Sequence, residues 1–387
     1  MKKYKMHKKI KNFPVQISEA IYDTKDLSIN LDKIHRIVIA GMGGSAMAGL
    51  IMRDISPELE IIVERNYFPN AIIDEGTLLI MCSYSGDTEE TLSYYQHASS
   101  FTKNIFGITS GGKLLELLKS DNHDYHILPE GYPPRSILGY TLTVLIKLLD
   151  GDELLKLLSI DLLQDYSNKF SLEDSEIFSI AKKIHSTFPV IVTEEDLSSI
   201  GYRLKCQLNE NSKMLSYNVT LPEMNHNEIV GWNSKMTDKN LFSLIWIDIT
   251  FPVIVTEEDL FSIGYRLKCQ LNENSKMLSY NITLPEMNHN ELVGWDSKMI
   301  DKDLFSLIWI DITFPANIKR MDITNKMLSN KNSYSHHIQV PDDLKNDLTG
   351  LFYLINYIDW LSYWCGHLND INIDTIESID ILKEKLA

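Results

Sequence analysis

Residues 36–50, RIVIAGMGGSAMAGL, decide the fold that we expect for this chain. The run 36–40 is typical of a buried parallel strand, and the glycines after it predict a tight turn. Small residues with good helix propensity follow from Ser45, so we expect a helix to begin there. A strand, a glycine turn and a helix N-terminus can bind an anion, although the same sequence also suits a turn without a ligand. The spacing fits neither the dinucleotide-binding GxGxxG motif nor a P-loop.

Length and composition indicate an ordinary globular protein of two domains. The chain has 387 residues, of which 44% are hydrophobic and 23% charged. Its formal net charge of −16 argues against nucleic-acid and anionic-membrane partners. The N-terminal lysines are not followed by an apolar segment, so we expect a solvated, partly frayed terminus and not a signal peptide. No run of 18 apolar residues predicts a membrane span.

The cysteines indicate a reducing compartment, most simply the cytoplasm. None of the four stands in a CxxC pair, which argues against a zinc site or a redox motif, and we expect no metal and no cofactor. The four are Cys82, Cys206, Cys269 and Cys365.

The first part of the chain alternates short apolar runs with helical patterns. After one or two covering helices in 1–35, strands are predicted at 36–40, 60–64, 77–83, 104–109 and 125–128, and helices at 45–54, 87–98 and 112–119. This alternation is typical of a parallel sheet covered on both faces, whose ligands bind at the carboxyl ends of the strands. We assign it to a first domain at 1–150.

Hydroxyl groups and glycines gather at these carboxyl ends. The strand 77–83 runs into SYSGDT at 83–88, which offers the hydroxyls of Ser83, Ser85 and Thr88 and a helix N-terminus. Helix capping by Asp87 or Thr88 would explain one hydroxyl of the three. A third such turn, TSGG, occupies 109–112. Three turns of this kind predict a phosphate site.

These residues resemble the sugar isomerase (SIS) domain, whose phosphosugar loop has the form S-x-S-G-x-T. Ser83, Ser85, Gly86 and Thr88 fit this loop, and Ser45 matches the serine of the glycine-rich first turn. The resemblance implies a flavodoxin-like parallel sheet and a bound sugar phosphate. The implied phosphate-binding residues are Gly43, Gly44, Ser45, Ser83, Ser85 and Thr88.

The segment YPPRS at 132–136 places an arginine between the last predicted strand of the first domain, 125–128, and a predicted helix at 137–149. Its two prolines stiffen the chain and hold Arg135 at the helix start. By position alone, Arg135 could equally be a solvated loop residue. The segment resembles Y-P-x-R-S of the bifunctional phosphoglucose/phosphomannose isomerase family.

A long repeat follows the acidic, leucine-rich segment 150–171, where we place the start of a second domain at 151–387. Residues 188–250 recur as 251–313 with six differences. Two copies are too few for a solenoid, so we infer a recent tandem duplication, or an error of sequence assembly, in a parent of 387 − 63 = 324 residues. Expected strands are 189–193, 241–249, 304–312 and 336–340, and expected helices are 172–186, 197–215, 317–330, 348–361 and 376–386.

The repeat contains a carboxylate and an imidazole 16 residues apart, Glu210 and His226, which recur as Glu273 and His289. Such a pair could act as a general base and a ring-opening acid–base. From the residues alone, Glu210 could equally be a carboxylate on the surface of a helix, and His226 a hydrogen-bonded histidine in a loop.

The motifs N-E-N-x-K and P-E-x-N-H-N-E-x-x-G-W, which surround these residues, resemble the second SIS-type domain of the same isomerase family. The resemblance implies Glu210 or Glu273 as the base and His226 or His289 as the ring opener. It further implies a homodimer in which the histidine comes from the neighbouring subunit. Lys383 matches the family's closing lysine, whereas 370–374 lacks the expected D-P-T pattern that helps set selectivity between glucose and mannose.

We therefore expect a metal-independent aldose–ketose isomerase of hexose 6-phosphates (glucose 6-phosphate and fructose 6-phosphate, with mannose 6-phosphate as a further substrate) acting through a cis-enediol. Arg135 would stabilise the enediolate, so that no metal is required. The alternatives are a sugar-phosphate-binding SIS protein without catalysis and an isomerase of another phosphosugar. We expect one repeat copy to build each site, and the first is favoured because Ser198 suits an exposed helix start better than Phe261.

Overall fold

The computed structural model divides the chain into two compact units. Unit 1 comprises Met1–His7, Lys169–Lys345 and Leu354–Ala387, and unit 2 comprises Lys8–Asn168 and Asn346–Tyr353. The helices that follow the predicted boundary at residue 150, α7 (Glu153–Lys156) and α8 (Ile160–Phe170), group with unit 2. The structure describes residues 4–221, 223–226, 253–257, 280–284, 305–310, 318–319, 322–323, 326, 334–344, 348–370 and 372–374.

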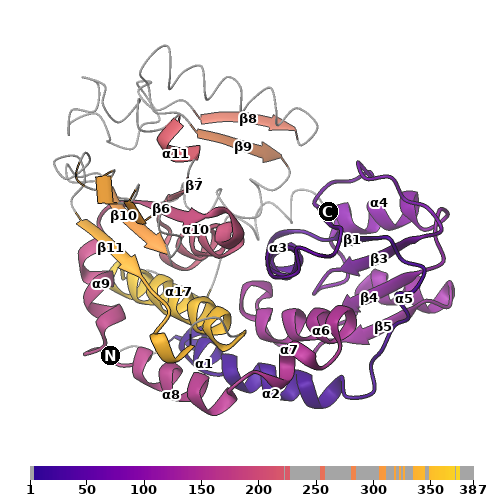
Figure 1. Ribbon diagram of the computed structural model, residues 1–387, viewed down its shortest axis with the longest axis horizontal. Coiled ribbons are helices and arrows are strands. Elements are labelled where there is room, and N and C mark those ends of the chain that lie inside the picture. Colours follow the sequence, from indigo (N-terminus) through magenta and orange to yellow (C-terminus); the bar gives the residue numbers. More distant parts are fainter. Residues whose placement is uncertain are drawn as a thin grey trace. The chain divides into compact units, whose positions relative to one another are not determined.

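Unit 2 is built on a five-stranded parallel sheet (Figure 1). The strand order β2-β1-β3-β4-β5 is flavodoxin-like, and its direction switches beside β1, where such sheets bind ligands. Val38 and Leu79 in the two central strands are fully buried, as the apolar runs predicted. The strands are β1 (Arg36–Ala40), β2 (Ile61–Glu64), β3 (Thr77–Cys82), β4 (Ile105–Thr109) and β5 (Asp124–Ile127).

The helices of unit 2 follow the predicted alternation. One face of the sheet packs against Tyr94 and Tyr95 of one helix and Leu114 and Leu118 of the next. Gly43 adopts a φ of +50°, and its helix begins there, two residues before the predicted start at Ser45. The helices are α2 (Phe13–Asp23), α3 (Gly43–Ile55), α4 (Glu89–Ala98), α5 (Gly112–Ser120), the 3-10 turn η1 (Pro134–Ser136) and α6 (Leu138–Asp150).

The prediction of a frayed N-terminus was wrong from residue 4 onward, because these residues form a packed helix, α1 (Lys5–Lys11). Met6 and Ile10, one helical turn apart, are buried, while the lysines Lys5 and Lys8 stay exposed. The backbone N–H groups of Lys5 and Met6 donate to the carboxylate of Asp374 at 3.0 and 2.8 Å. The residue where the family's D-P-T pattern is missing thus has a structural role in unit 1.

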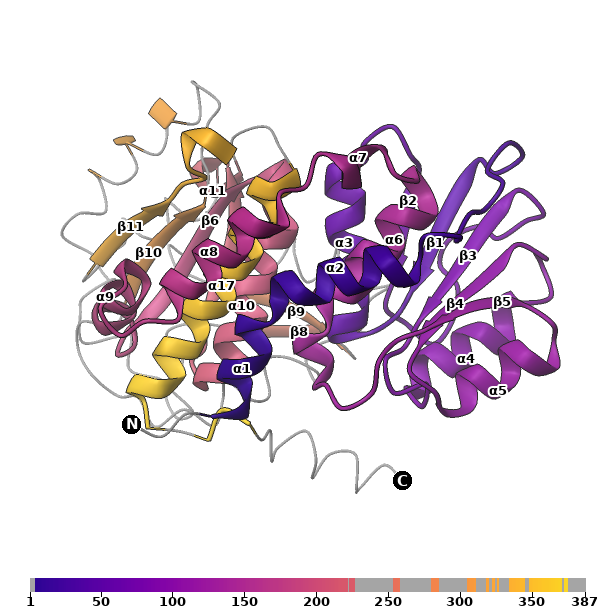
Figure 2. The ribbon, with the colours of Figure 1, turned by 90° about the horizontal axis from the view of Figure 1, so that it is seen from below.

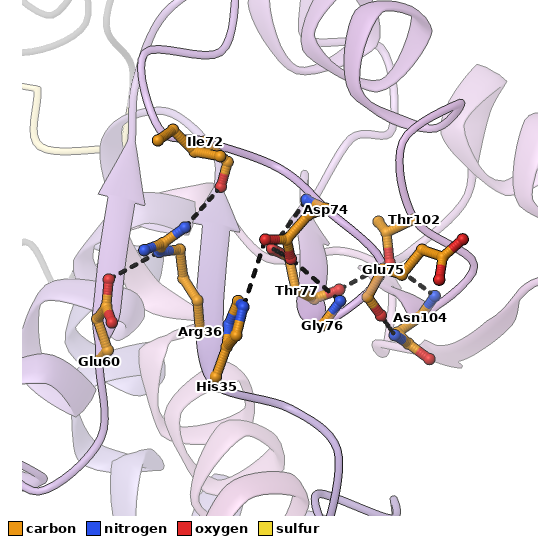
Figure 3. Close-up of polar contacts among 10 residues, drawn as sticks. All are labelled: His35, Arg36, Glu60, Ile72, Asp74, Glu75, Gly76, Thr77, Thr102 and Asn104. Carbon is orange, nitrogen blue, oxygen red and sulfur yellow. Dashed lines mark hydrogen bonds and ion pairs between the residues drawn. The ribbon is translucent and has the colours of Figure 1, made fainter.

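At the amino end of the sheet in unit 2, polar side chains fix the loops that enter the strands (Figure 3). Arg36 donates to Glu60 and to the carbonyl of Ile72, and His35 lies 3.3 Å from the Asp74 carboxylate. The same carboxylate accepts bonds from Gly76 N and Thr77 Oγ1, both at 3.0 Å. These groups are occupied in holding loops together, whereas the hydroxyl-rich turns lie at the opposite, carboxyl end.

Unit 1 contains a four-stranded parallel sheet of order β11-β10-β6-β7 that draws on both repeat copies. β6 (Phe188–Glu194) and β7 (Tyr217–Leu221) belong to copy one, and β10 (Phe305–Ile310) belongs to copy two. β11 (Tyr334–Ile338) follows the repeat. β7 falls in a segment that we expected to be a loop. The predicted strand at 241–249 lies outside the described residues.

The start of copy two forms a separate two-stranded parallel sheet from β8 (Val253–Glu257) and β9 (Tyr280–Leu284). Its register begins with Val253 opposite Tyr280, and in copy one Val190 lies opposite Tyr217. Both members of the pair are displaced by 63 residues, so the two copies pair their strands identically. The pairing is therefore a local property of the repeated sequence.

The helices of unit 1 are α9 (Glu176–Ile184), the 3-10 turn η2 (Glu195–Leu197), α10 (Ser198–Ser212), α11 (Glu223–His226) and the part of α17 (Leu348–Leu368) that follows Tyr353, beside the 3-10 turn η4 (Asp342–Leu344). A Cβ at Gly201 would lie 2.4 Å from the Asn218 amide nitrogen, so α10 packs closely on β7. The predicted helix 376–386 and most of 317–330 lie outside the described residues. Within the described residues, no helix is long and apolar enough to cross a membrane.

The sheet pairing predicts unequal effects of one substitution made in both copies. Ile191 of β6 is fully buried between two neighbouring strands, so Ile191→Ala should lower the free energy of unfolding by about 2–5 kcal/mol. Ile254→Ala, in the two-stranded sheet, should cost well under half of that, because two-stranded sheets are marginally stable. Urea unfolding of the two variants measures the difference, and equal losses would contradict the described pairing.

Candidate active site

The first glycine turn lies between β1 and α3 and allows two close backbone approaches. A Cβ at Gly41 would lie 2.6 Å from the carbonyl oxygen of Cys82 at the end of β3. A Cβ at Gly44 would lie 2.7 Å from the carbonyl oxygen of Pro134. Any larger residue at position 44 would push η1, which carries Arg135, away from the first turn of α3. Because the first N–H groups of a helix have no partner within it, Gly43 and Gly44 present donors at this point.

The second turn, at 83–88, is held by its own hydroxyl groups. Ser83 Oγ and Thr88 Oγ1 lie 2.9 Å apart, and Ser83 Oγ also accepts from Gly86 N at 3.1 Å. Thr88 is the N-cap of α4, yet its hydroxyl makes no capping bond. Ser45 Oγ accepts from Tyr84 N at 3.3 Å and so connects the first turn to the second. Helix capping therefore does not explain these hydroxyls.

The third turn, at 109–112, packs directly against the second. Gly86, with a φ of +73°, lies so close to the carbonyl of Gly111 that a Cβ would clash at 1.8 Å. Ser110 donates to the carbonyl of Tyr84 through both N and Oγ, at 2.9 and 2.6 Å. Lys113 N donates to the Asp87 carboxylate at 3.0 Å. The three turns thus form one interlocked group at the carboxyl edge of the sheet.

Arg135 is 6% exposed, so it is not a solvated loop arginine. Its neighbour Ser136 accepts a bond from Gln16 Nε2 at 2.8 Å through the backbone carbonyl, which fixes η1 against α2. Tyr84 OH donates to Pro129 O and accepts from Tyr132 N, at 2.9 and 3.0 Å. This tyrosine, which the sequence interpretation missed, therefore joins the second turn to the segment leading to Arg135. Burial raises its pKa, so the phenol keeps the proton it donates.

The thiol nearest to these turns is inert. Cys82 is fully buried at the end of β3, and burial raises the pKa of its thiol to about 12. A thiolate nucleophile is therefore not available there at neutral pH. The three turns and η1 bring hydroxyl groups, backbone N–H groups and the Arg135 guanidinium to this edge, and these groups suit a phosphate and a second, developing negative charge.

In unit 1, Glu210 lies in the last turn of α10 and is 9% exposed. A carboxylate on the surface of a helix would be exposed, so that alternative does not hold for Glu210. Lys213 caps the C-terminal end of α10 in the left-handed conformation, at a φ of +54°, and donates through Nζ to the carbonyl of Glu210 at 2.7 Å. The backbone of Glu210 is therefore fixed at a capped helix end, and a general base needs such a fixed position.

The other predicted residues are placed less fully. His226 ends α11, directly after β7, and only its backbone is described. Glu273, His289 and Lys383 lie outside the described residues. Among the described residues, no group of three or more His, Cys, Asp or Glu could hold a metal ion.

A family model matches the second part of the chain twice. The bacterial phospho-glucose isomerase C-terminal SIS domain matches residues 173–250 and again 245–386, so each match contains one repeat copy. Among solved structures, glucosamine-6-phosphate deaminase from Thermotoga maritima has a TM-score of 0.57 at 13% identity and covers 95% of this chain and 96% of its own. Tagatose-6-phosphate ketose/aldose isomerase from Escherichia coli has a TM-score of 0.54 at 13% identity, over 95% and 94%. These two likenesses show the fold.

Curated relatives match along the whole chain. A bifunctional phosphoglucose/phosphomannose isomerase from Thermoplasma volcanium is 37% identical, over 96% of this chain and 100% of its own. Another, from Caldicellulosiruptor bescii, is 32% identical over 99% of both. A D-glucosamine-6-phosphate 4-epimerase from Sulfolobus acidocaldarius is 30% identical, over 67% of this chain and 91% of its own. With a matching family model and relatives of this identity over nearly its full length, the chain belongs to the bifunctional phosphoglucose/phosphomannose isomerase family.

Proposed function

We propose that this chain interconverts the aldose and ketose forms of hexose 6-phosphates, with glucose 6-phosphate and fructose 6-phosphate as the principal pair and mannose 6-phosphate as a further aldose. The observation that carries the proposal is the interlocked group of three turns with the buried Arg135 packed beside the first. The names of the relatives support the same substrate class. The three cysteines that the structure describes, Cys82, Cys206 and Cys365, are buried free thiols, which fits a reducing cytoplasm.

In this proposal the turns hold the phosphate. The hydroxyls of Ser45, Ser83, Ser85 and Thr88 and the first N–H groups of α3 donate to its oxygens. Arg135 stabilises the negative charge that develops on the sugar oxygen when the enediolate forms. Because arginine and backbone donors supply this stabilisation, the reaction needs no metal ion.

The proton transfer is assigned to Glu210. Its carboxylate takes the proton from C2 of the aldose, the electrons of that C–H bond form the C1–C2 double bond, and the electrons of the C1 carbonyl move onto O1. A proton then passes from O2 to O1. As the C2 carbonyl forms, the electrons of the C1–C2 double bond take the proton back from the carboxylic acid onto C1. His226 opens the sugar ring by moving a proton between the ring oxygen and the anomeric hydroxyl. By likeness to the family, this histidine comes from the neighbouring subunit of a homodimer, and Lys383 brings a cation to the phosphosugar.

One relative favours a second candidate. The D-glucosamine-6-phosphate 4-epimerase shares 30% identity over two thirds of the chain, so a related phosphosugar is a reasonable alternative substrate. An amino group at C2 would replace the hydroxyl that an aldose–ketose isomerisation requires there. Activity on glucosamine 6-phosphate therefore separates the two candidates.

A coupled assay for fructose 6-phosphate tests the proposal directly. We expect turnover of glucose 6-phosphate that is unchanged in excess EDTA, and parallel reactions contain mannose 6-phosphate and glucosamine 6-phosphate. Loss of activity on chelation would contradict the metal-free mechanism. Conversion of glucosamine 6-phosphate alone would replace the isomerase by the second candidate, and ligand binding without any turnover would leave a sugar-phosphate sensor.

Arg135→Lys keeps the positive charge but removes the planar fork of donors. If Arg135 stabilises the enediolate, kcat should fall by about 100-fold, the cost typical of removing one oxyanion donor, while KM changes much less. Steady-state kinetics with both hexose phosphates measure the two constants. An unchanged kcat would make Arg135 a phosphate-binding or structural residue.

The two copies of the glutamate provide a matched pair of variants. Glu210→Gln should abolish turnover, because the amide cannot accept the C2 proton, and Glu273→Gln should leave it largely intact. Exchange of the C2 deuterium with solvent, followed in the same samples, reports the proton transfer itself. Equal partial losses would mean that both copies can supply the base.

A further inference from the structure

The helix that carries Glu210 is unusual because its buried face is polar. Arg203, in the second turn of α10, is 2% exposed and forms a two-pronged ion pair with Asp359 of α17, which is 4% exposed. Nε lies 3.0 Å from Oδ1 and Nη2 lies 2.7 Å from Oδ2. Both views show α17 beside α10 (Figure 1 and Figure 2). Burial raises the pKa of the Asp359 carboxyl, and the adjacent guanidinium opposes that shift.

The last turn of α10 makes a second set of contacts with α17. Asn211 Nδ2 donates to Ser362 Oγ at 3.0 Å and to Gln207 Oε1 at 2.7 Å, while Ser362 Oγ donates to the carbonyl of Asp359 at 2.8 Å. Ser212 Oγ donates to the carbonyl of Ser362, and Asn369 Nδ2 donates to the carbonyl of Ser212 at 3.1 Å.

A glycine brings the two helices together at this end. A Cβ at Gly366 of α17 would lie 2.3 Å from the carbonyl oxygen of Asn211, so only glycine allows the contact. Glu210 directly precedes Asn211 and follows Arg203 by two helical turns. Its backbone is therefore held on both sides, by the ion pair and by the contacts of the last turn.

We propose that α17 positions the base of the reaction, and that it thereby decides which repeat copy is catalytically competent. The inference rests on the proposed function of Glu210. Copy two carries the same side chains at Arg266, Gln270, Asn274 and Ser275, so none of the side chains that contact α17 separates the copies. The neighbouring helix does separate the copies, because α17 lies outside the repeat and its sequence occurs once.

The energetics favour an arrangement in which one of the two repeated helices packs against α17. An arginine buried without its carboxylate costs several kcal/mol of stability, and each buried amide or hydroxyl without a partner adds to that cost. A second helix of the same sequence cannot use Asp359 and Ser362 while α10 does. A base displaced by about 1 Å loses on the order of 100-fold in rate, so the helix without α17 carries a glutamate that does not catalyse.

The first experiment compares Arg203→Met with Arg266→Met in the full chain. Removing Arg203 leaves Asp359 buried and unpaired, so Tm should fall by about 10 °C and turnover should be lost. Arg266→Met should change Tm by less than about 2 °C and leave turnover intact. If the Arg203 variant is recovered only as aggregate while the Arg266 variant folds, the result likewise supports the assignment of copy one to α17. Equal shifts, or a larger shift for Arg266, would overturn the assignment.

The second experiment separates positioning from stability. Ser362→Ala removes the acceptor that α17 offers to Asn211 but no charge, so kcat should fall by about tenfold, with KM within about twofold and a small change in Tm. Ser362→Thr keeps the hydroxyl and should restore most of kcat. A lower Tm without any change in kcat would overturn the positioning role. A wild-type chain without turnover would instead refute the proposed function, and the Tm difference between the two arginine variants would still show which copy α17 holds.

Discussion

The sheet of unit 1 has one position between β10 and β7, and the first strand of copy one, β6, occupies it. The backbone N–H and C=O groups of a central strand are hydrogen-bonded to the strands on both sides, so a second strand of the same sequence cannot pair there. The sheet nevertheless takes β10 from copy two, in register with β6 from Phe305 opposite Phe188 to Ile310 opposite Thr193. One complete set of strands is thus assembled from the beginning of one copy and the end of the other.

The two units treat polar groups in different ways. In unit 2 the hydroxyls of the turns are held by one another and by backbone groups at the carboxyl edge of the sheet. In unit 1 charged and amide side chains of α10 are buried against a neighbouring helix. Buried polar groups stabilise little by themselves, but once fully paired they specify one arrangement of the helices. That specificity is what a helix carrying a general base requires.

Much of unit 2 could be predicted from the sequence. Its five strands lie within one or two residues of their predicted positions, because short apolar runs between glycine- and hydroxyl-rich turns are a strong signal. The start of α3 was harder, since glycine gives no helix signal, and Gly43 begins the helix with a positive φ. The packing of Gly44 against Pro134 joins residues 90 apart in sequence, and no local pattern reports such a contact.

Unit 1 was less predictable. Tyr217–Leu221 alternates apolar and polar residues as a half-buried strand does, but β7 was missed because the segment is short and closely follows a helix. The burial of α10 was missed because its residues are those of a surface helix, and their partners Asp359 and Ser362 lie about 150 residues later. The roles of Glu210 and His226 came from a resemblance, since no spacing of a glutamate and a histidine specifies an isomerase.

The identical register of β6–β7 and β8–β9 bears on how such a gene can change. Tandem copies recombine with each other, and loss of one unit removes 63 residues wherever the exchange falls. If residues 222–284 were lost, β7 would continue into Pro285, which begins the same PEMNHNE sequence as Pro222. The strands β6, β7 and β10 would keep their sequence and order, so selection acting on this sheet would not distinguish the longer allele from the shorter one.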